Sequence, residues 1–98
     1  MAKYSTTREY TELTADECFN RAGAALSQSG YEILKKRDFA WLVIGKMKAD
    51  HGMLEANISA RPGSQTITTF SLSSDEIPQP ALKEYAETLI QSFENLNV

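Results

Sequence analysis

The sequence predicts a single α+β domain, a curved antiparallel sheet that carries two helices on one of its faces. The first observation is the run FAWLVIGKM at residues 39–47, which is rich in aromatic and β-branched side chains. Its length suits a central strand and is too short to span a membrane. The second is a pair of amphipathic segments with helical spacing, one before and one after the predicted strands. Both helices must bury an apolar stripe and only one sheet is available, so we expect them to share one face of it.

Length and composition limit the chain to one domain, residues 1–98, in which residues 1–6 are expected to fray. The single cysteine, Cys18, cannot form an intrachain disulfide, which fits a reducing compartment such as the cytoplasm. A formal net charge of −3 argues against nucleic acid as a partner. We find no apolar run long enough for a membrane span and no signal peptide, so no membrane contact is expected.

The first predicted helix follows a short strand expected at residues 7–13. Thr14 and Glu17 form a capping box, in which each side chain accepts a hydrogen bond from the other residue's amide. The helix is expected to run to about Ser29 and to end at Gly30, since glycine readily adopts a left-handed conformation. Its predicted inner face consists of Cys18, Phe19, Ala22, Ala25 and Leu26.

Three strands are predicted next, at residues 31–36, 39–47 and 53–61. A hairpin loop over residues 49–52 sets apolar side chains of the last two strands opposite each other, in the pairs Met47–Leu54, Gly45–Ala56, Val43–Ile58 and Trp41–Ala60. We therefore predict Trp41, Val43 and Met47 in the core. The same alternation leaves Leu42 and Ile44 on the second face.

The C-terminal part predicts a type II turn at Pro62-Gly63, a strand at residues 66–73 and a helix that begins near Pro80. Phe70 and Leu72 are assigned to the core, and Ile67 to the opposite face. The helix has one broad apolar stripe, made of Leu82, Tyr85, Ala86, Leu89, Ile90, Phe93 and Leu96. If the first strand pairs with the last, the strand order is 1-5-4-3-2; the alternative is a three- or four-stranded sheet without the N-terminal strand.

This element order, together with stretches such as ALSQSGYEIL at residues 25–34, resembles the half-repeat of TATA-box-binding-protein-like folds and small bacterial domains of that shape. The resemblance implies a β-α-β4-α fold over most of the chain. It carries no catalytic motif and therefore implies no activity.

No arrangement of residues predicts catalysis, and we expect no catalytic residue, no metal site and no cofactor. His51 is the only histidine and lies in a predicted turn, where an exposed polar residue is ordinary. A nucleophilic pair of Cys18 with His51 is disfavoured because Cys18 lies on the apolar side of a helix. Lys35, Lys36 and Arg37 form a basic cluster, which is either a solvated turn or a small anion contact.

The most informative feature is the set of residues left outside the predicted core. An interaction surface is predicted on the helix-free face, made of Leu42, Ile44, Asn57, Ser59, Ile67 and Thr69. We therefore expect a small non-enzymatic binding module whose partner is another protein or a second copy in a homodimer. The alternative is a small-ligand carrier or enzyme with a pocket between sheet and helices. It is motivated by Ala22, Gly23 and Gly45, which could leave space beside Trp41 and Tyr85.

Overall fold

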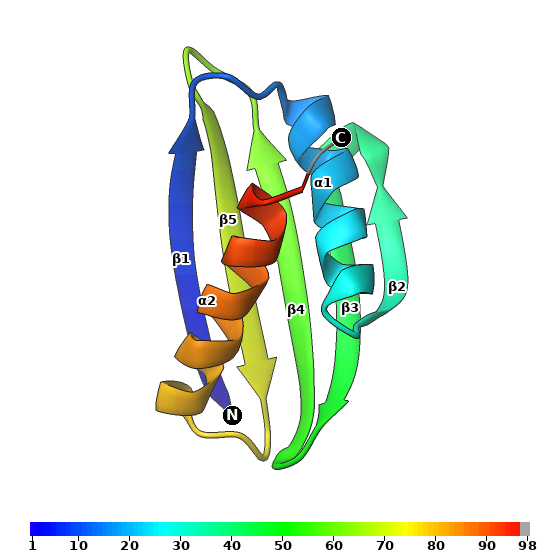
Figure 1. Cartoon of the computed structure of the whole chain (residues 1–98), viewed down its shortest axis with the longest axis vertical. Helices are drawn as coiled ribbons and strands as arrows, with labels where there is room; N and C mark the ends of the chain where they lie inside the picture. Colours follow the sequence, from blue (N-terminus) through cyan, green and yellow to red (C-terminus); the bar gives the residue numbers. More distant parts are fainter. Residues whose placement is uncertain (97–98) are drawn as a thin grey trace.

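The five strands form one open antiparallel sheet in the order β1-β5-β4-β3-β2, which confirms the predicted topology (Figure 1). The computed structural model describes residues 1–96. In chain order its elements are β1 (Ala2–Tyr10), α1 (Ala15–Gln28), β2 (Glu32–Arg37), a short 3-10 helix η1 (Asp38–Ala40), β3 (Leu42–Ala49), β4 (Gly52–Arg61), β5 (Thr66–Ser74) and α2 (Gln79–Glu94).

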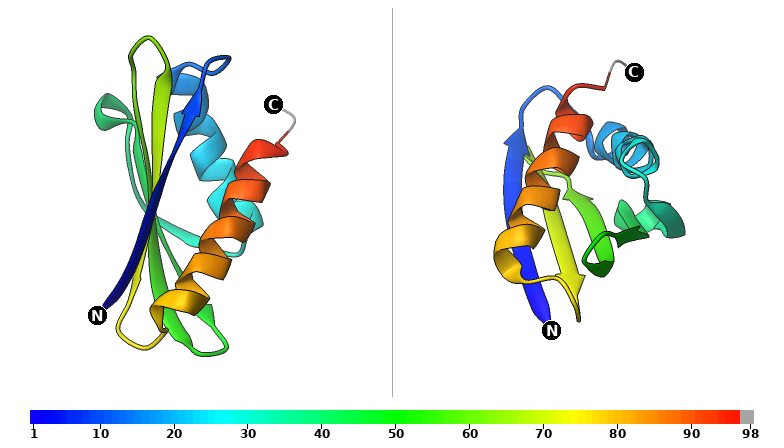
Figure 2. Two further views of the ribbon diagram at one scale, coloured as in Figure 1. Left: turned by 90° about the vertical axis from the view of Figure 1, so that its left-hand side faces the viewer. Right: turned by 60° about the horizontal axis from the view of Figure 1, so that its bottom comes forward.

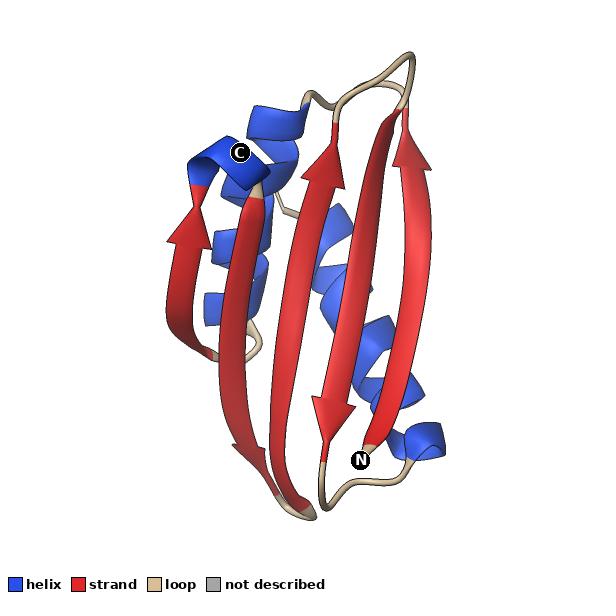
Figure 3. Cartoon of the chain, turned by 180° about the vertical axis from the view of Figure 1, so that it is seen from behind, coloured by secondary structure: helices blue, strands red, loops and turns tan. Residues whose placement is uncertain are grey.

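Both helices lie on the same face of the sheet, as predicted, and the other face is left uncovered by residues 1–96 (Figures 2 and 3). Helix α1 packs on β4, β2 and β3, and α2 packs on β1 and β5. The core lies between the layers, where the rings of Phe70 and Phe93 meet edge to face at 5.2 Å. This division fixes which strand residues remain available for binding.

The register of β3 against β4 is as predicted. Val43 faces Ile58, and Lys46 faces Glu55 on the opposite side of the sheet. The loop is shorter by one residue at each end, because Ala49 pairs with Gly52. Gly52 adopts a φ of +135°, which a residue with a side chain would accommodate poorly. Shortening at both ends leaves the register unchanged.

The hairpin of β4 and β5 confirms that Phe70 and Leu72 are buried and that Ile67 points to the other face. The last facing pair is Arg61 with Ile67, so five residues, 62–66, lie between them. The predicted type II turn is wrong, because Gly63 has no positive φ and the connection is wider than a tight turn.

Strand β1 differs from the prediction in its bounds. It begins at Ala2 and ends at Tyr10, and all nine of its residues pair with β5. Residues 2–6, expected to fray, therefore belong to the strand, whereas Thr11–Leu13 lie outside it. The alternative sheet without an N-terminal strand is wrong.

The prediction that residues 39–47 form one strand is wrong for the first three residues. The Asp38 side chain accepts a 2.8 Å hydrogen bond from the amide of Phe39, and its carbonyl accepts one from the amide of Trp41. These bonds close a turn in which Phe39 is 74% exposed and Trp41 has a left-handed backbone with φ 48°. Aspartate favours such turns by bonding to nearby amides.

Of the three predicted core residues in this run, Val43 is fully buried, whereas Trp41 and Met47 are half-buried and pack against the edge of the core. The helix predictions are confirmed. Thr14 and Glu17 make both bonds of the capping box, and Gly30 has φ 92° just after α1.

Candidate functional site

The helix-free face of the sheet, called the open face below, is built from alternate residues of all five strands (Figure 3). From β1 across to β2, its three complete rows read Lys3–Ser73–Glu55–Lys46–Glu32, Ser5–Ser71–Asn57–Ile44–Lys35 and Thr7–Thr69–Ser59–Leu42–Arg37. A fourth row holds Glu9, Ile67 and Arg61. The side chains of the open face are therefore mainly small hydroxyl groups in the middle of β1 and β5, and mainly aliphatic or charged groups on β3 and β2.

All six residues of the predicted interaction surface lie on the open face and are half-buried: Leu42, Ile44, Asn57, Ser59, Ile67 and Thr69. Leu42 and Ile44 are successive open-face residues of β3. Ile67 is two strands away on β5, with the polar residues of β4 between them. The aliphatic side chains thus form one pair and one isolated residue, and do not form a continuous patch.

The half of the open face formed by β1 and β5 is lined by small hydroxyl side chains. The hydroxyl groups of Ser5 and Ser71 are hydrogen-bonded to each other at 2.9 Å. Next to Ser71, the Oδ1 atom of Asn57 is buried and has no hydrogen-bond partner among residues 1–96. This half is polar apart from Ile67, so neighbouring aliphatic side chains occur only in the half formed by β3 and β2.

The predicted basic cluster does not form a single site. A bulge between Ile33 and Lys35 places Lys35 beside Ile44 and Arg37 beside Leu42, both on the open face. The ammonium group of Lys36 points to the helix side, where it lies 5.6 Å from the ring centre of Phe19. Only two of the three cations can therefore contact the same ligand.

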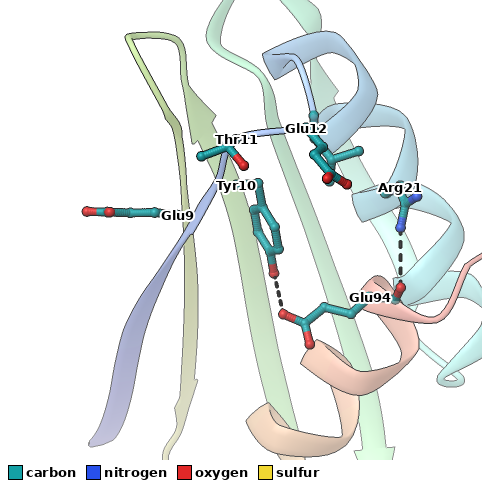
Figure 4. A pocket seen from close by; sticks show the side chains of 7 residues that line it. Glu9, Tyr10, Thr11, Glu12, Arg21 and Glu94 are labelled. Carbon is teal, nitrogen blue, oxygen red and sulfur yellow. Dashed lines mark hydrogen bonds between the residues drawn. The ribbon is translucent and has the colours of Figure 1, made fainter.

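A separate cleft of about 340 Å³ lies between the end of β1, α1 and the last turn of α2 (Figure 4). Its polar lining includes the carboxylates of Glu12 and Glu94, whereas the Glu9 side chain points away from the cleft (Figure 4). The Tyr10 hydroxyl donates a 2.8 Å hydrogen bond to Glu94. Burial, followed by the hydrogen bond and charge of Glu94, raises the pKa of Tyr10 above its ordinary value. Tyr10 is therefore a neutral donor near neutral pH and not a base.

The cation in this cleft has a structural partner. Nη1 of Arg21 donates to the carbonyl oxygens of Phe93 at 3.1 Å and Glu94 at 3.5 Å, at the C-terminus of α2 (Figure 4). The last turn of α2 has no basic residue of its own, so Arg21 supplies the charge that a helix C-terminus favours. The Tyr10 hydroxyl and Nη1 of Arg21 are thus paired within the fold, whereas Nε of Arg21 is buried without a hydrogen-bond partner among residues 1–96.

Cys18 is a buried thiol, and burial is the largest of the effects that raise its pKa. It accepts a hydrogen bond from Thr68 in the core, whereas His51 is exposed in the β3–β4 turn beside α2. The described residues contain no group of three or more side chains able to hold a metal ion.

The space expected beside the small residues of the core is filled. A Cβ on Gly45 would lie 3.2 Å from Tyr31 and 3.6 Å from Leu26, and one on Gly23 would lie 3.2 Å from the Lys36 ammonium. The free space that motivated a ligand pocket between sheet and helices is therefore not found at Gly23 or Gly45.

Phe39 is an exposed aromatic residue next to the open face, although its apolar run predicted a place in the central strand. Its ring lies 6.0 Å from the guanidinium of Arg37, and the signal for its exposure was Asp38, a turn-forming residue inside an apolar run.

No helix within residues 1–96 has the length and apolarity needed to cross a membrane. Comparison with models of known protein families gives no match to this chain, and comparison with curated proteins gives no similar sequence.

Proposed function

We propose that this protein is a non-enzymatic binding module, and that its open face binds a protein segment in which aliphatic side chains alternate with acidic ones. The observation that carries the proposal is the pair Leu42 and Ile44, half-buried on the open face of β3, with Arg37 and Lys35 as their neighbours on β2. An extended segment lying along β3 would contact both side chains of the pair.

The apolar contribution comes from a few side chains at one corner of the face. Leu42 and Ile44 are joined there by Phe39, which is 74% exposed in the preceding turn. Burying apolar surface stabilises a complex by roughly 25 cal/mol per Å². Three such side chains suit a weak, reversible contact.

The charges at this corner favour an acidic partner. Lys46 lies between Glu55 and Glu32 in its row, so its charge is balanced within the open face. Lys35 and Arg37 have no acidic neighbour in their own rows. Carboxylates of a bound segment would supply the missing opposite charges and fix its register.

A protein partner fits this face better than a nucleic acid does. Phe39 is the one exposed aromatic side chain at this corner, and the three complete rows add no second ring on which successive bases could stack. The chain has a formal net charge of −3, which opposes general attraction to a phosphate backbone.

The test uses a synthetic peptide in which Leu and Ile alternate with Glu, added to isotope-labelled protein and followed by amide chemical shifts. We expect saturable shifts along β3 and β2, and none with a peptide in which Lys replaces Glu. Lys35→Glu should weaken binding at least tenfold, because a carboxylate then replaces the ammonium group that attracts the acidic ligand. Lys36→Glu is the matched control, since its side chain lies on the helix side, and should leave binding unchanged.

Absence of any shift at millimolar peptide, or equal losses in the two lysine variants, would overturn the proposal. Shifts confined to the cleft beside Tyr10 would move the binding site there. Loss of protein self-association in Leu42→Glu would instead assign the open face to a second copy of the chain.

A further inference from the structure

We propose that β1 is the interface of a homodimer, in which the β1 strands of two copies pair antiparallel around a two-fold axis at Thr6. This inference goes beyond the proposed function and does not depend on it, because it uses the edge of the sheet and not its open face. Two copies joined in this way would share a continuous ten-stranded sheet, with all four helices on one side and both open faces on the other.

The two edges of the sheet differ in their protection. Strand β2 has six residues, a bulge and three consecutive cations at Lys35, Lys36 and Arg37, all of which discourage pairing with another strand. Strand β1 has nine residues in unbroken register with β5, and it contains no proline, glycine or bulge. Its outer side has no neighbouring strand within residues 1–96. A long regular edge of this kind is a template for another strand.

The outward backbone groups of β1 are identified by two hydrogen bonds. The carbonyl oxygen of Lys3 accepts from the Gln79 side chain at 3.3 Å, and that of Thr7 accepts from the Arg8 guanidinium at 3.1 Å. Both residues are odd-numbered, so the N–H and C=O groups of the odd-numbered residues face away from β5. These single side-chain bonds are replaceable by the paired backbone bonds of a second strand.

The side chains of β1 select one register for a pair of identical strands. With Thr6 opposite its own copy, Lys3 faces Glu9 and Ser5 faces Thr7 on the open-face side, each pair occurring twice. On the helix side Arg8 faces Tyr4, a cation next to an aromatic ring. Centring the pair on Ser5 or on Thr7 leaves Lys3 opposite a threonine and creates no pair of opposite charges. Only the register centred on Thr6 is therefore complementary in charge.

The shape of the helix layer agrees with this arrangement. The first turn of α2 lies beyond the outer edge of β1, near the N-terminal end of the strand, in both face-on views (Figures 1 and 3). In the antiparallel pair this turn lies over the opposite end of the second β1, where Arg8 is exposed on the helix side. The two-fold axis repeats the contact at the other end of the interface.

The decisive experiment exchanges the charges and measures the dimer dissociation constant by sedimentation velocity. Lys3→Glu and Glu9→Lys should each weaken the homodimer about tenfold or more, because both symmetry-related pairs become like-charged. The double variant, and an equimolar mixture of the two single variants, should restore association. Within one chain Lys3 faces Ser73 and Glu9 faces Ile67, so these substitutions leave the fold intact. Circular dichroism checks that the secondary structure is retained.

Two controls separate this interface from the binding surface of the open face. Leu42→Glu, which alters the proposed peptide site, should leave the dimer unchanged. Ser5→Pro removes an outward amide that a second β1 strand would need, and should abolish the dimer. The fold should be retained, because proline is tolerated where the N–H of an edge residue faces away from the sheet. A wild-type protein that stays monomeric at millimolar concentration overturns the proposal. So does a dimer that is insensitive to the charge exchange, or one that is lost in Leu42→Glu.

Discussion

The indole Nε1 of Trp41 donates a 2.9 Å hydrogen bond to Oδ1 of Asp16, and this bond joins the turn before β3 to the first turn of α1. Asp16 also places a negative charge at the N-terminus of α1, where the helix dipole favours it. One carboxylate therefore stabilises both the helix and the start of the central hairpin.

Asp16→Ala should lower the free energy of unfolding by about 1–2 kcal/mol, the sum of one hydrogen bond and one charge at a helix N-terminus. Asp16→Asn is the control, because it keeps an acceptor for the indole and loses the charge, and should fall between the alanine variant and wild type. Urea denaturation followed by the fluorescence of Trp41, the only tryptophan, measures both variants. Equal stability of Asp16→Ala and wild type would contradict the structural role of this bond.

The backbone of Trp41 predicts an unusual order of stability for two truncations. Its φ of 48° is in the left-handed region, which costs a residue with a Cβ about 1 kcal/mol or more. Trp41→Gly and Trp41→Ala both remove the ring, but only glycine relieves this strain. We expect the glycine variant to be the more stable of the two by about 1 kcal/mol, as measured by urea denaturation with circular dichroism. The reverse order would show that the turn relaxes once the indole is removed.

The register between two paired strands was the feature of the fold that the sequence predicted best. The β3–β4 register followed from matching apolar residues across a hairpin, and a one-residue slip would have set apolar against polar residues throughout. The start of β3 could not be predicted in this way. The apolar run continues through Phe39, whereas the backbone there is set by hydrogen bonds of Asp38 and by the distant Asp16.

The candidate site was predictable in its aliphatic residues and not in its cations. Plain alternation from Ile33 would place Lys36 on the open face, opposite Leu42. The bulge inserts one residue, so that Lys35 lies opposite Ile44 and Arg37 lies opposite Leu42. Lys36 turns to the helix side. Nothing in the local sequence marks this bulge.

Removing the hydroxyl group should affect the stability of the protein differently at Tyr31 and at Tyr10. The Tyr31 hydroxyl is buried and has no hydrogen-bond partner among residues 1–96, whereas that of Tyr10 donates to Glu94. Tyr31→Phe should be as stable as wild type or more stable, because an unpaired buried polar group is removed. Tyr10→Phe should lose about 1 kcal/mol, the usual net contribution of a hydrogen bond, because this bond to Glu94 is exposed to solvent. Urea titrations at pH 7 compare them, and a larger loss for Tyr31→Phe would contradict the packing.

The same tyrosines should make the protein less stable at alkaline pH. Burial is the main cause that raises the pKa of both Tyr31 and Tyr10 above the usual value of about 10. A raised folded-state pKa gives stability that is complete below the unfolded-state pKa and is lost as the pH rises above it. Wild-type protein should therefore lose stability above about pH 10, and Tyr31→Phe should lose less. Parallel curves for the two proteins between pH 9 and pH 11 would contradict this assignment.

Arg21 joins the two helices through the C-terminal carbonyl groups of α2, and its removal should loosen that end of the domain. Arg21→Met keeps the apolar stem but loses a charged donor to the Phe93 carbonyl, so we expect a loss of about 1–3 kcal/mol in the free energy of unfolding. Arg21→Lys keeps the charge at the helix terminus but not the planar donor group, and should lose less. Because the helix-terminus effect is electrostatic, the difference between the methionine and lysine variants should shrink in 1 M NaCl. A methionine variant as stable as wild type would show that the hydrogen bonds to α2 do not contribute to stability.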